Sequence, residues 1–161
     1  MVAEAIACYQ RAIEFSPKSA ELRNSLAWLL ATSTDAKLLD PKKAVELAKK
    51  ALELAPEAGM YWNTLGAAQY RAGNWKEATL ALEKSMELRK SGDSFDWFFL
   101  AMARCQLGEK EKGREWYDKA VQWMDKNAPQ NEELSRLRKE AEELLKKDSG
   151  IRKEIPLTSD S

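Results

Sequence analysis

Residues that could perform catalysis or bind a metal are few in this sequence, and their spacing suits neither role. The chain has no histidine, which removes the commonest general base, proton shuttle and metal ligand. Cys8 and Cys105 form neither a CxxC pair nor another metal-binding spacing. Glutamates such as Glu46, Glu53 and Glu77 recur at helix-surface spacings, where pairing with neighbouring cations explains them better than acid–base chemistry. We therefore expect no enzymatic activity, no catalytic residues, no metal and no cofactor.

Composition narrows the class of partner. The 26 basic residues balance the 26 acidic residues, so no net charge draws the chain to nucleic acid or to an anionic membrane. The sequence lacks the apolar run of roughly 18 residues that a membrane span needs, and it lacks the basic and apolar regions of a signal peptide. We expect both cysteines to be small buried thiols, which is consistent with a cytoplasmic protein that binds no nucleic acid and no membrane.

The elements that must position any functional residue recur along the chain. Small residues repeat in two series that step by 39, 34 and 35 residues, namely Ala5, Ala44, Ala78 and Gly113, and Ala12, Ala51, Ser85 and Ala120. A leucine series steps by 39, 35 and 34 residues, namely Leu26, Leu65, Leu100 and Leu134. A period in the mid-thirties is typical of helix pairs stacked on copies of themselves, and small side chains let two helix axes approach closely. The longer first step predicts a five-residue insertion within ATSTDAKLLDPKK.

The apolar periodicity predicts about eight helices and no strand, near residues 2–15, 20–31, 41–55, 59–72, 75–90, 94–107, 110–126 and 131–147. The last helix has a narrow apolar stripe that includes Leu134, Leu137 and Ala141 within a charged surface. That stripe favours a C-terminal capping helix, with partner binding by its charged face as the alternative. Residues 148–161 show no period and are predicted to be a flexible tail.

The best-defined unit, YWNTLGAAQYRAGNWKEATLALEKSMEL, resembles a tetratricopeptide repeat. Trp62, Leu65, Gly66 and Ala78 match the signature, whereas Tyr70 lies one residue late. The resemblance covers roughly residues 2 to 147 and extends to repeats of large multidomain planctomycete-type bacterial proteins. It implies an all-α, right-handed α-solenoid of antiparallel helix pairs. The expected divisions are a half repeat at 2–19, repeats at 20–58, 59–93 and 94–127, and a capping helix at 130–147. The chain is thus expected to begin mid-repeat, as part of a longer protein.

In tetratricopeptide proteins the first helices of successive units line a concave groove. Carrying that over residue by residue implies a peptide-binding groove formed by Asn24, Trp28, Met60, Asn63, Tyr70, Arg71, Phe95, Phe98 and Met102. Some of these aromatic residues could instead belong to the core. One subclass of the family clamps a C-terminal carboxylate with lysine, arginine and asparagine, but apolar residues hold most of those positions here. The groove should therefore prefer apolar or mixed segments.

Two functions remain. The first is a protein–protein interaction module that binds a partner peptide or helix in the concave groove, with Asn24 and Asn63 exposed, as a scaffold part of a larger protein. The alternative is a structural spacer or self-association element. It would use an exposed apolar face of the N-terminal half repeat, with Ile6, Tyr9 and Ile13, in a monomer or weak homodimer.

Overall fold

The computed structural model describes residues 1–147, which form eight α-helices and no strand. The all-α prediction is thereby confirmed, and the predicted flexible tail at 148–161 lies outside the described residues. The helices are α1 (Val2–Phe15), α2 (Ala20–Thr32), α3 (Pro41–Leu54), α4 (Gly59–Arg71), α5 (Trp75–Arg89), α6 (Ser94–Gln106), α7 (Lys110–Asn127) and α8 (Glu132–Lys147).

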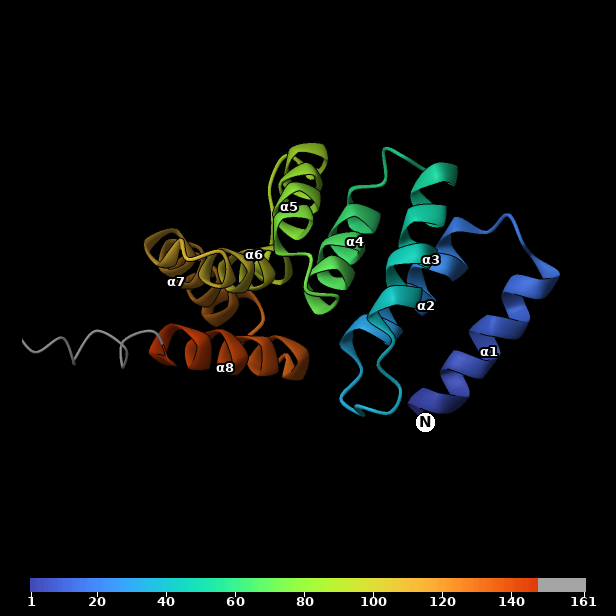
Figure 1. Cartoon of the computed structure of the whole chain (residues 1–161), viewed down its shortest axis with the longest axis horizontal. Coiled ribbons are helices and arrows are strands. Elements are labelled where there is room, and N and C mark those ends of the chain that lie inside the picture. Colours follow the sequence, from blue (N-terminus) through green and yellow to red (C-terminus); the bar gives the residue numbers. More distant parts are fainter. Residues whose placement is uncertain (148–161) are drawn as a thin grey trace, which may run out of the picture.

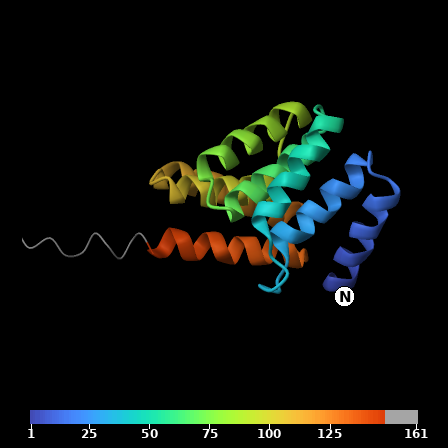
Figure 2. The same cartoon turned by 45° about the vertical axis from the view of Figure 1, so that its right-hand side comes forward.

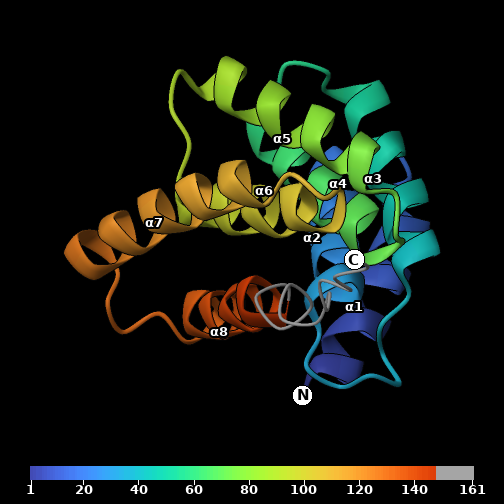
Figure 3. The same ribbon diagram turned by 60° about the vertical axis from the view of Figure 1, so that its left-hand side comes forward.

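Consecutive helices lie side by side as antiparallel pairs in a curved stack (Figure 1). Helix α2 pairs with α3, α4 with α5, and α6 with α7, while α4 also contacts both helices of the pair before it. The pair α6 and α7 runs at a steep angle to α4 and α5 (Figure 1). Helix α8 packs along α6 and α7 (Figure 3), and its first turns point toward α2 (Figure 2).

Side-chain caps mark the start of α2, α3 and α6. The side chain of Ser19 accepts a hydrogen bond from a backbone N–H at the start of α2, and Asp40 does the same for α3, where Pro41 occupies the first turn. Asp93 and Asp96 form a reciprocal capping box at the start of α6. These local signals set the helix boundaries close to their predicted positions.

The predicted insertion lies between the helices of the first pair. Residues 33–40 separate α2 from α3, which is eight residues, whereas three residues (72–74 and 107–109) separate the helices of the next two pairs. The connection in the first pair is therefore longer by the five residues that the sequence predicted. The longer connection is held to α2 by a hydrogen bond from the Asp40 N–H to the Leu30 carbonyl, at 3.0 Å.

The recurring small residues mark close helix crossings. Ala44, Ala78 and Ser85 are completely buried, as expected where two axes approach. Helices α4 and α5 also approach closely at Gly66, because a Cβ built there would lie 2.5 Å from Leu82 Cγ and 2.6 Å from Leu82 Cδ2. Leu82 is itself fully buried, so only glycine fits at this crossing of α4 and α5.

The first helix contradicts two expectations. Ile6 is buried, and Tyr9 and Ile13 are partly buried against the same apolar cluster, because this face of α1 packs on α2. The predicted exposed apolar face of the half repeat is therefore wrong. Cys8 is exposed, contrary to expectation, because it lies on the side of α1 away from that cluster, whereas Cys105 is buried as expected. Within residues 1–147, no helix combines the length and apolar character of a membrane span.

Replacing Gly66 by alanine tests the crossing of α4 and α5. Alanine is the better helix former by about 0.5–1 kcal/mol, but overpacking a filled core costs about 1–3 kcal/mol. We therefore expect Gly66→Ala to lower the free energy of unfolding, measured by urea denaturation. In a Leu82→Ala background the same change should cost far less, and an equal cost in both backgrounds would contradict the close contact.

Candidate functional site

A pocket of about 500 Å³ lies among α1, α2, α4 and the first turns of α6 and α8. Its volume falls within the range of roughly 300–1,000 Å³ that is usual for ligand sites. Five of the nine predicted groove residues line it, namely Asn24, Trp28, Met60, Asn63 and Phe95. The other lining residues include Ala5, Tyr9, Ser25, Leu29, Thr64, Asp93 and Glu133. Helices α2, α4 and α6 thus each contribute predicted residues to the lining of one pocket.

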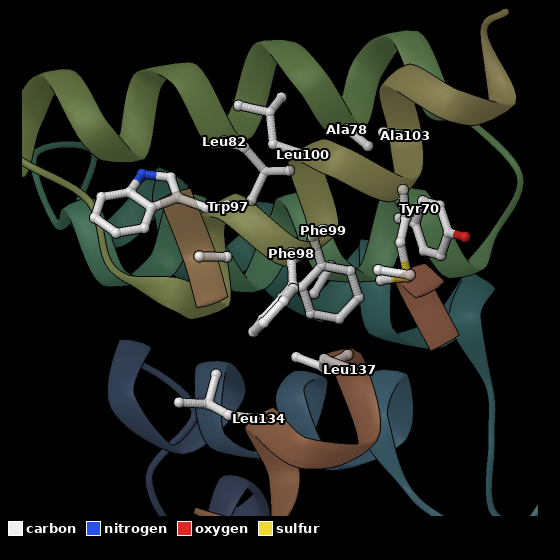
Figure 4. Packing of buried hydrophobic residues seen from close by; sticks show 14 of the residues in the cluster. Tyr70, Ala78, Leu82, Trp97, Phe98, Phe99, Leu100, Ala103, Leu134 and Leu137 are labelled. Carbon is white, nitrogen blue, oxygen red and sulfur yellow. The ribbon is translucent and has the colours of Figure 1, made fainter. Parts of the chain in front are cut away.

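The other four predicted residues lie where α8 covers the groove. Tyr70, Phe98 and Met102 belong to the same buried cluster as Leu134 and Leu137 of α8. Phe98 and Met102 are fully buried. Figure 4 shows Leu134 and Leu137 facing the rings of Phe98 and Phe99. The prediction that Tyr70, Phe98 and Met102 are accessible to a partner is therefore wrong. The apolar stripe of α8 fills this half of the groove.

Arg71, the fourth of these residues, fastens α8 to α4. Its two terminal nitrogens bind the two carboxylate oxygens of Glu140, with Nη2 to Oε2 at 2.9 Å. The guanidinium also lies over the rings of Phe99 and Tyr70, 5.5 and 5.6 Å from their centres. Bidentate pairing combined with ring contact is characteristic of arginine. Arg71 therefore binds within the chain, although it was predicted to face a partner.

Two further contacts hold α8 against α7. The Tyr117 hydroxyl donates a hydrogen bond to the Glu142 carboxylate. Arg138 forms an ion pair with Asp125, with Nη1 to Oδ1 at 2.9 Å. Burial, and next the hydrogen bond to Glu142, raise the pKa of Tyr117 to about 12. The charged surface of α8 is thus used in part for intramolecular attachment.

Asn63 is held by a buried carboxylate. Its side-chain Nδ2 donates to Asp96 Oδ1 at 2.8 Å, and the Ser85 hydroxyl donates to the same oxygen at 2.8 Å. The second oxygen of Asp96 accepts from Arg89 Nη1 at 2.8 Å and from the Asp93 backbone N–H at 3.1 Å. Asn63 is only 3% exposed, so its expected exposure is wrong. The reason is that α6 brings Asp96 against α4.

The environment of Asp96 opposes its ionisation in one respect and supports it in another. Burial, followed by the nearby Asp93 carboxylate, raises the pKa of Asp96 above its ordinary value. Hydrogen bonds from Asn63 and Ser85 and the charge of Arg89 act in the opposite direction. These partners compensate a carboxylate that would otherwise be costly to bury.

The pocket is bordered by aromatic rings and acceptor atoms. Trp28 and Phe95 are both partly buried and meet edge to face, with ring centres 5.9 Å apart. The Asn24 Oδ1 atom is buried and accepts no hydrogen bond from any described residue. The charged residues among the described lining are Asp93 and Glu133, and no lysine or arginine is among them.

Sequence reasoning missed seven of the lining residues, namely Ala5, Tyr9, Ser25, Leu29, Thr64, Asp93 and Glu133. Asp93 carried a detectable signal, because aspartate before a helix is a common N-cap, but the cap role did not indicate that it borders a pocket. Glu133 belongs to α8, whose path across the groove depends on packing. Within residues 1–147, no group of three or more cysteine, aspartate or glutamate side chains could hold a metal ion.

Comparisons with known proteins agree with the helical architecture. Residues 33–93 match the sequence family described as tetratricopeptide repeat. One crystal structure of MamA has a TM-score of 0.60 at 20% identity, covering 90% of this chain and 89% of that chain. A second crystal structure of MamA protein has a TM-score of 0.61 at 21% identity, covering 98% of this chain and 89% of that chain. No curated protein matches the sequence. At these identities the structural similarity establishes the fold.

Removing the Asp96 carboxylate should reveal how strongly it joins α4, α5 and α6. We expect Asp96→Ala to lower the free energy of unfolding by about 3–5 kcal/mol, because Arg89 is left as a partly buried cation without this partner. Ser85→Ala removes one neutral donor and should cost only about 0.5–1.5 kcal/mol. Chemical denaturation of both variants provides the comparison. Similar small losses for the two would show that the carboxylate is not a central support.

Alkaline pH should loosen α8 through Tyr117. The folded-state pKa of about 12 lies above the ordinary value of 10.0 for a tyrosine phenol. The stabilisation by the neutral phenol is therefore complete below the lower value and is lost as the pH rises toward the higher one. We expect the natural chain to lose more stability over that range than Tyr117→Phe, measured by urea denaturation at each pH. Parallel profiles for the two proteins would contradict this role.

Proposed function

We propose that this chain, which is a tetratricopeptide-repeat protein, is a protein–protein interaction module that binds a partner segment in the pocket bordered by α1, α2 and α4. The proposed repeats occupy residues 20–58, 59–93 and 94–127, with a half repeat at 2–19 and a capping helix at 130–147. In this arrangement the stacked repeats are the scaffold, and the pocket is the place where they meet a partner.

The pocket itself is the observation that supports this proposal. Trp28 and Phe95 supply ring surface, and Met60 supplies an apolar side chain that is 56% exposed. Aromatic residues and methionine are enriched at protein interfaces because they bury large apolar areas and adapt to a partner. Asn24 adds an acceptor that can take a backbone or side-chain N–H from a bound segment.

The position of α8 limits the length of the partner contact. Its buried leucines cover Phe98 and Met102, and Glu140 binds Arg71. A partner in the proposed site therefore contacts the N-terminal half of the groove and reaches the first turn of α8 at Glu133. We propose a short segment, rather than a long helix lying along the whole concave face, as the bound element.

Two matched substitutions test the pocket. Met60 and Leu80 are exposed to similar degrees, 56% and 60%, but Leu80 lies on α5 and is not among the pocket-lining residues. Met60→Arg should block the pocket and weaken partner capture by about tenfold or more, whereas Leu80→Arg should retain it. Immobilised protein, lysate of the source cell and quantitative mass spectrometry provide the measurement. Partners that bind both variants equally would contradict the proposed site.

A further inference from the structure

The polar atoms that border the pocket are mainly arranged to accept hydrogen bonds. Asn24 Oδ1 has no donor among the described residues. One amide N–H of Asn63 donates to Asp96, so the amide oxygen remains as an acceptor beside the second N–H of the group. The Thr64 hydroxyl donates to the Met60 carbonyl at 3.3 Å, so its oxygen retains acceptor capacity. A ligand that satisfies this lining must bring N–H or O–H donors.

The charged residues among the described lining of the pocket are both acidic. Asp93 is paired with Arg89 at 2.6 Å, with both side chains partly buried. Glu133 lies in the first turn of α8 and forms no ion pair within 4.0 Å among the described residues. A smaller neighbouring cavity places Arg71 and Arg136 near the other side of Glu133, but Arg71 is paired with Glu140. The pocket thus offers a carboxylate to a cation, since its described lining has no lysine or arginine and the exposed Arg136 lines only the neighbouring cavity.

Elsewhere in this protein, an arginine already occupies a comparable surface of aromatic rings and a carboxylate from α8. Arg71 lies over the rings of Tyr70 and Phe99 and binds the Glu140 carboxylate from α8. In the pocket, Trp28 and Phe95 provide rings and Glu133 provides the α8 carboxylate. The two places share ring surface and an acidic side chain from α8, but no arginine is among the described residues that line the pocket.

We infer that the pocket recognises an arginine side chain of the partner segment, an inference that rests on the proposed function. The guanidinium would lie against Trp28 and Phe95 and donate toward Asn24, Asn63 and Glu133. Its five N–H donors in one plane can reach several acceptors while its flat face contacts an aromatic ring. Lysine offers a compact ammonium without that planar geometry.

Other segment chemistries fit the pocket less well. A carboxylate would lie beside Asp93 and Glu133 with no lysine or arginine among the described lining residues to bind it. A wholly apolar segment would leave Asn24 Oδ1, which is already buried, without a donor and would gain no hydrogen bond from it. Charge and hydrogen-bonding capacity therefore both favour the cationic segment.

The test is selection from a phage-displayed library of random peptides, carried out on three full-length proteins. They are the natural chain, Glu133→Lys, and the matched control Glu132→Lys, which makes the same charge change in the same helical turn at an exposed residue outside the pocket lining. Selected peptides are then synthesised with arginine or with citrulline, its uncharged isostere, and their Kd values are measured by calorimetry. Circular dichroism confirms that the variants are folded.

We expect arginine to be enriched in peptides selected by the natural chain and by Glu132→Lys, and the enrichment to disappear with Glu133→Lys. Citrulline should weaken binding by about tenfold or more, since a charged, multiply hydrogen-bonded contact is lost. Peptides without arginine enrichment that still require Met60 would overturn the inference but leave the proposed function standing. Peptides that bind Met60→Arg and Glu133→Lys as well as the natural chain, or a library without binders, would count against both.

Discussion

The contact between Asp96 and the middle repeat is the constraint on which the C-terminal half of the structure depends. Its carboxylate is completely buried and accepts hydrogen bonds from Asn63 on α4, Ser85 and Arg89 on α5, and the Asp93 backbone. A buried carboxylate is tolerated only when its partners are in place. The network therefore requires α4, α5 and the start of α6 to meet in one arrangement. Phe95 and Phe98 lie on either side of Asp96 in α6, so the network also determines where the aromatic lining of the groove begins.

Helix α8 then divides the groove into two parts with different roles. Over Phe98 and Met102 it acts as part of the core, since its leucines are buried there. At Glu133 it borders the pocket that remains. One amphipathic helix thus completes the apolar packing of the last repeat and supplies an acidic side chain to the candidate site. Its attachment through Glu140 and Glu142 explains why a helix so rich in charge is not simply a solvated cap.

Periodic features could be predicted from the sequence, whereas contacts between distant elements could not. The helix pairs and the insertion before Pro41 follow from spacing, because each helix pair repeats one local packing rule. Asn63 shows the limit. It occupies the same place in its repeat as Asn24, yet it is tied to a carboxylate 33 residues away, at Asp96, whereas the corresponding oxygen of Asn24 has no partner among residues 1–147. Equivalent positions in a repeat can differ because their neighbours in the next repeat differ.

The sequence by itself determined the all-α class and the stacked pairs, and it predicted five of the residues that line the pocket. Those features arise from helical periodicity and from small residues at recurring crossings, which are encoded within each unit. Only the tertiary structure decided that Tyr70, Phe98 and Met102 are covered and that Glu133 and Asp93 border the pocket. These outcomes depend on the angle between α6 and the preceding pair α4 and α5, and on the position of α8 across the groove. Both are set by side-chain packing and buried hydrogen bonds between segments far apart in the sequence, and no local pattern specifies them.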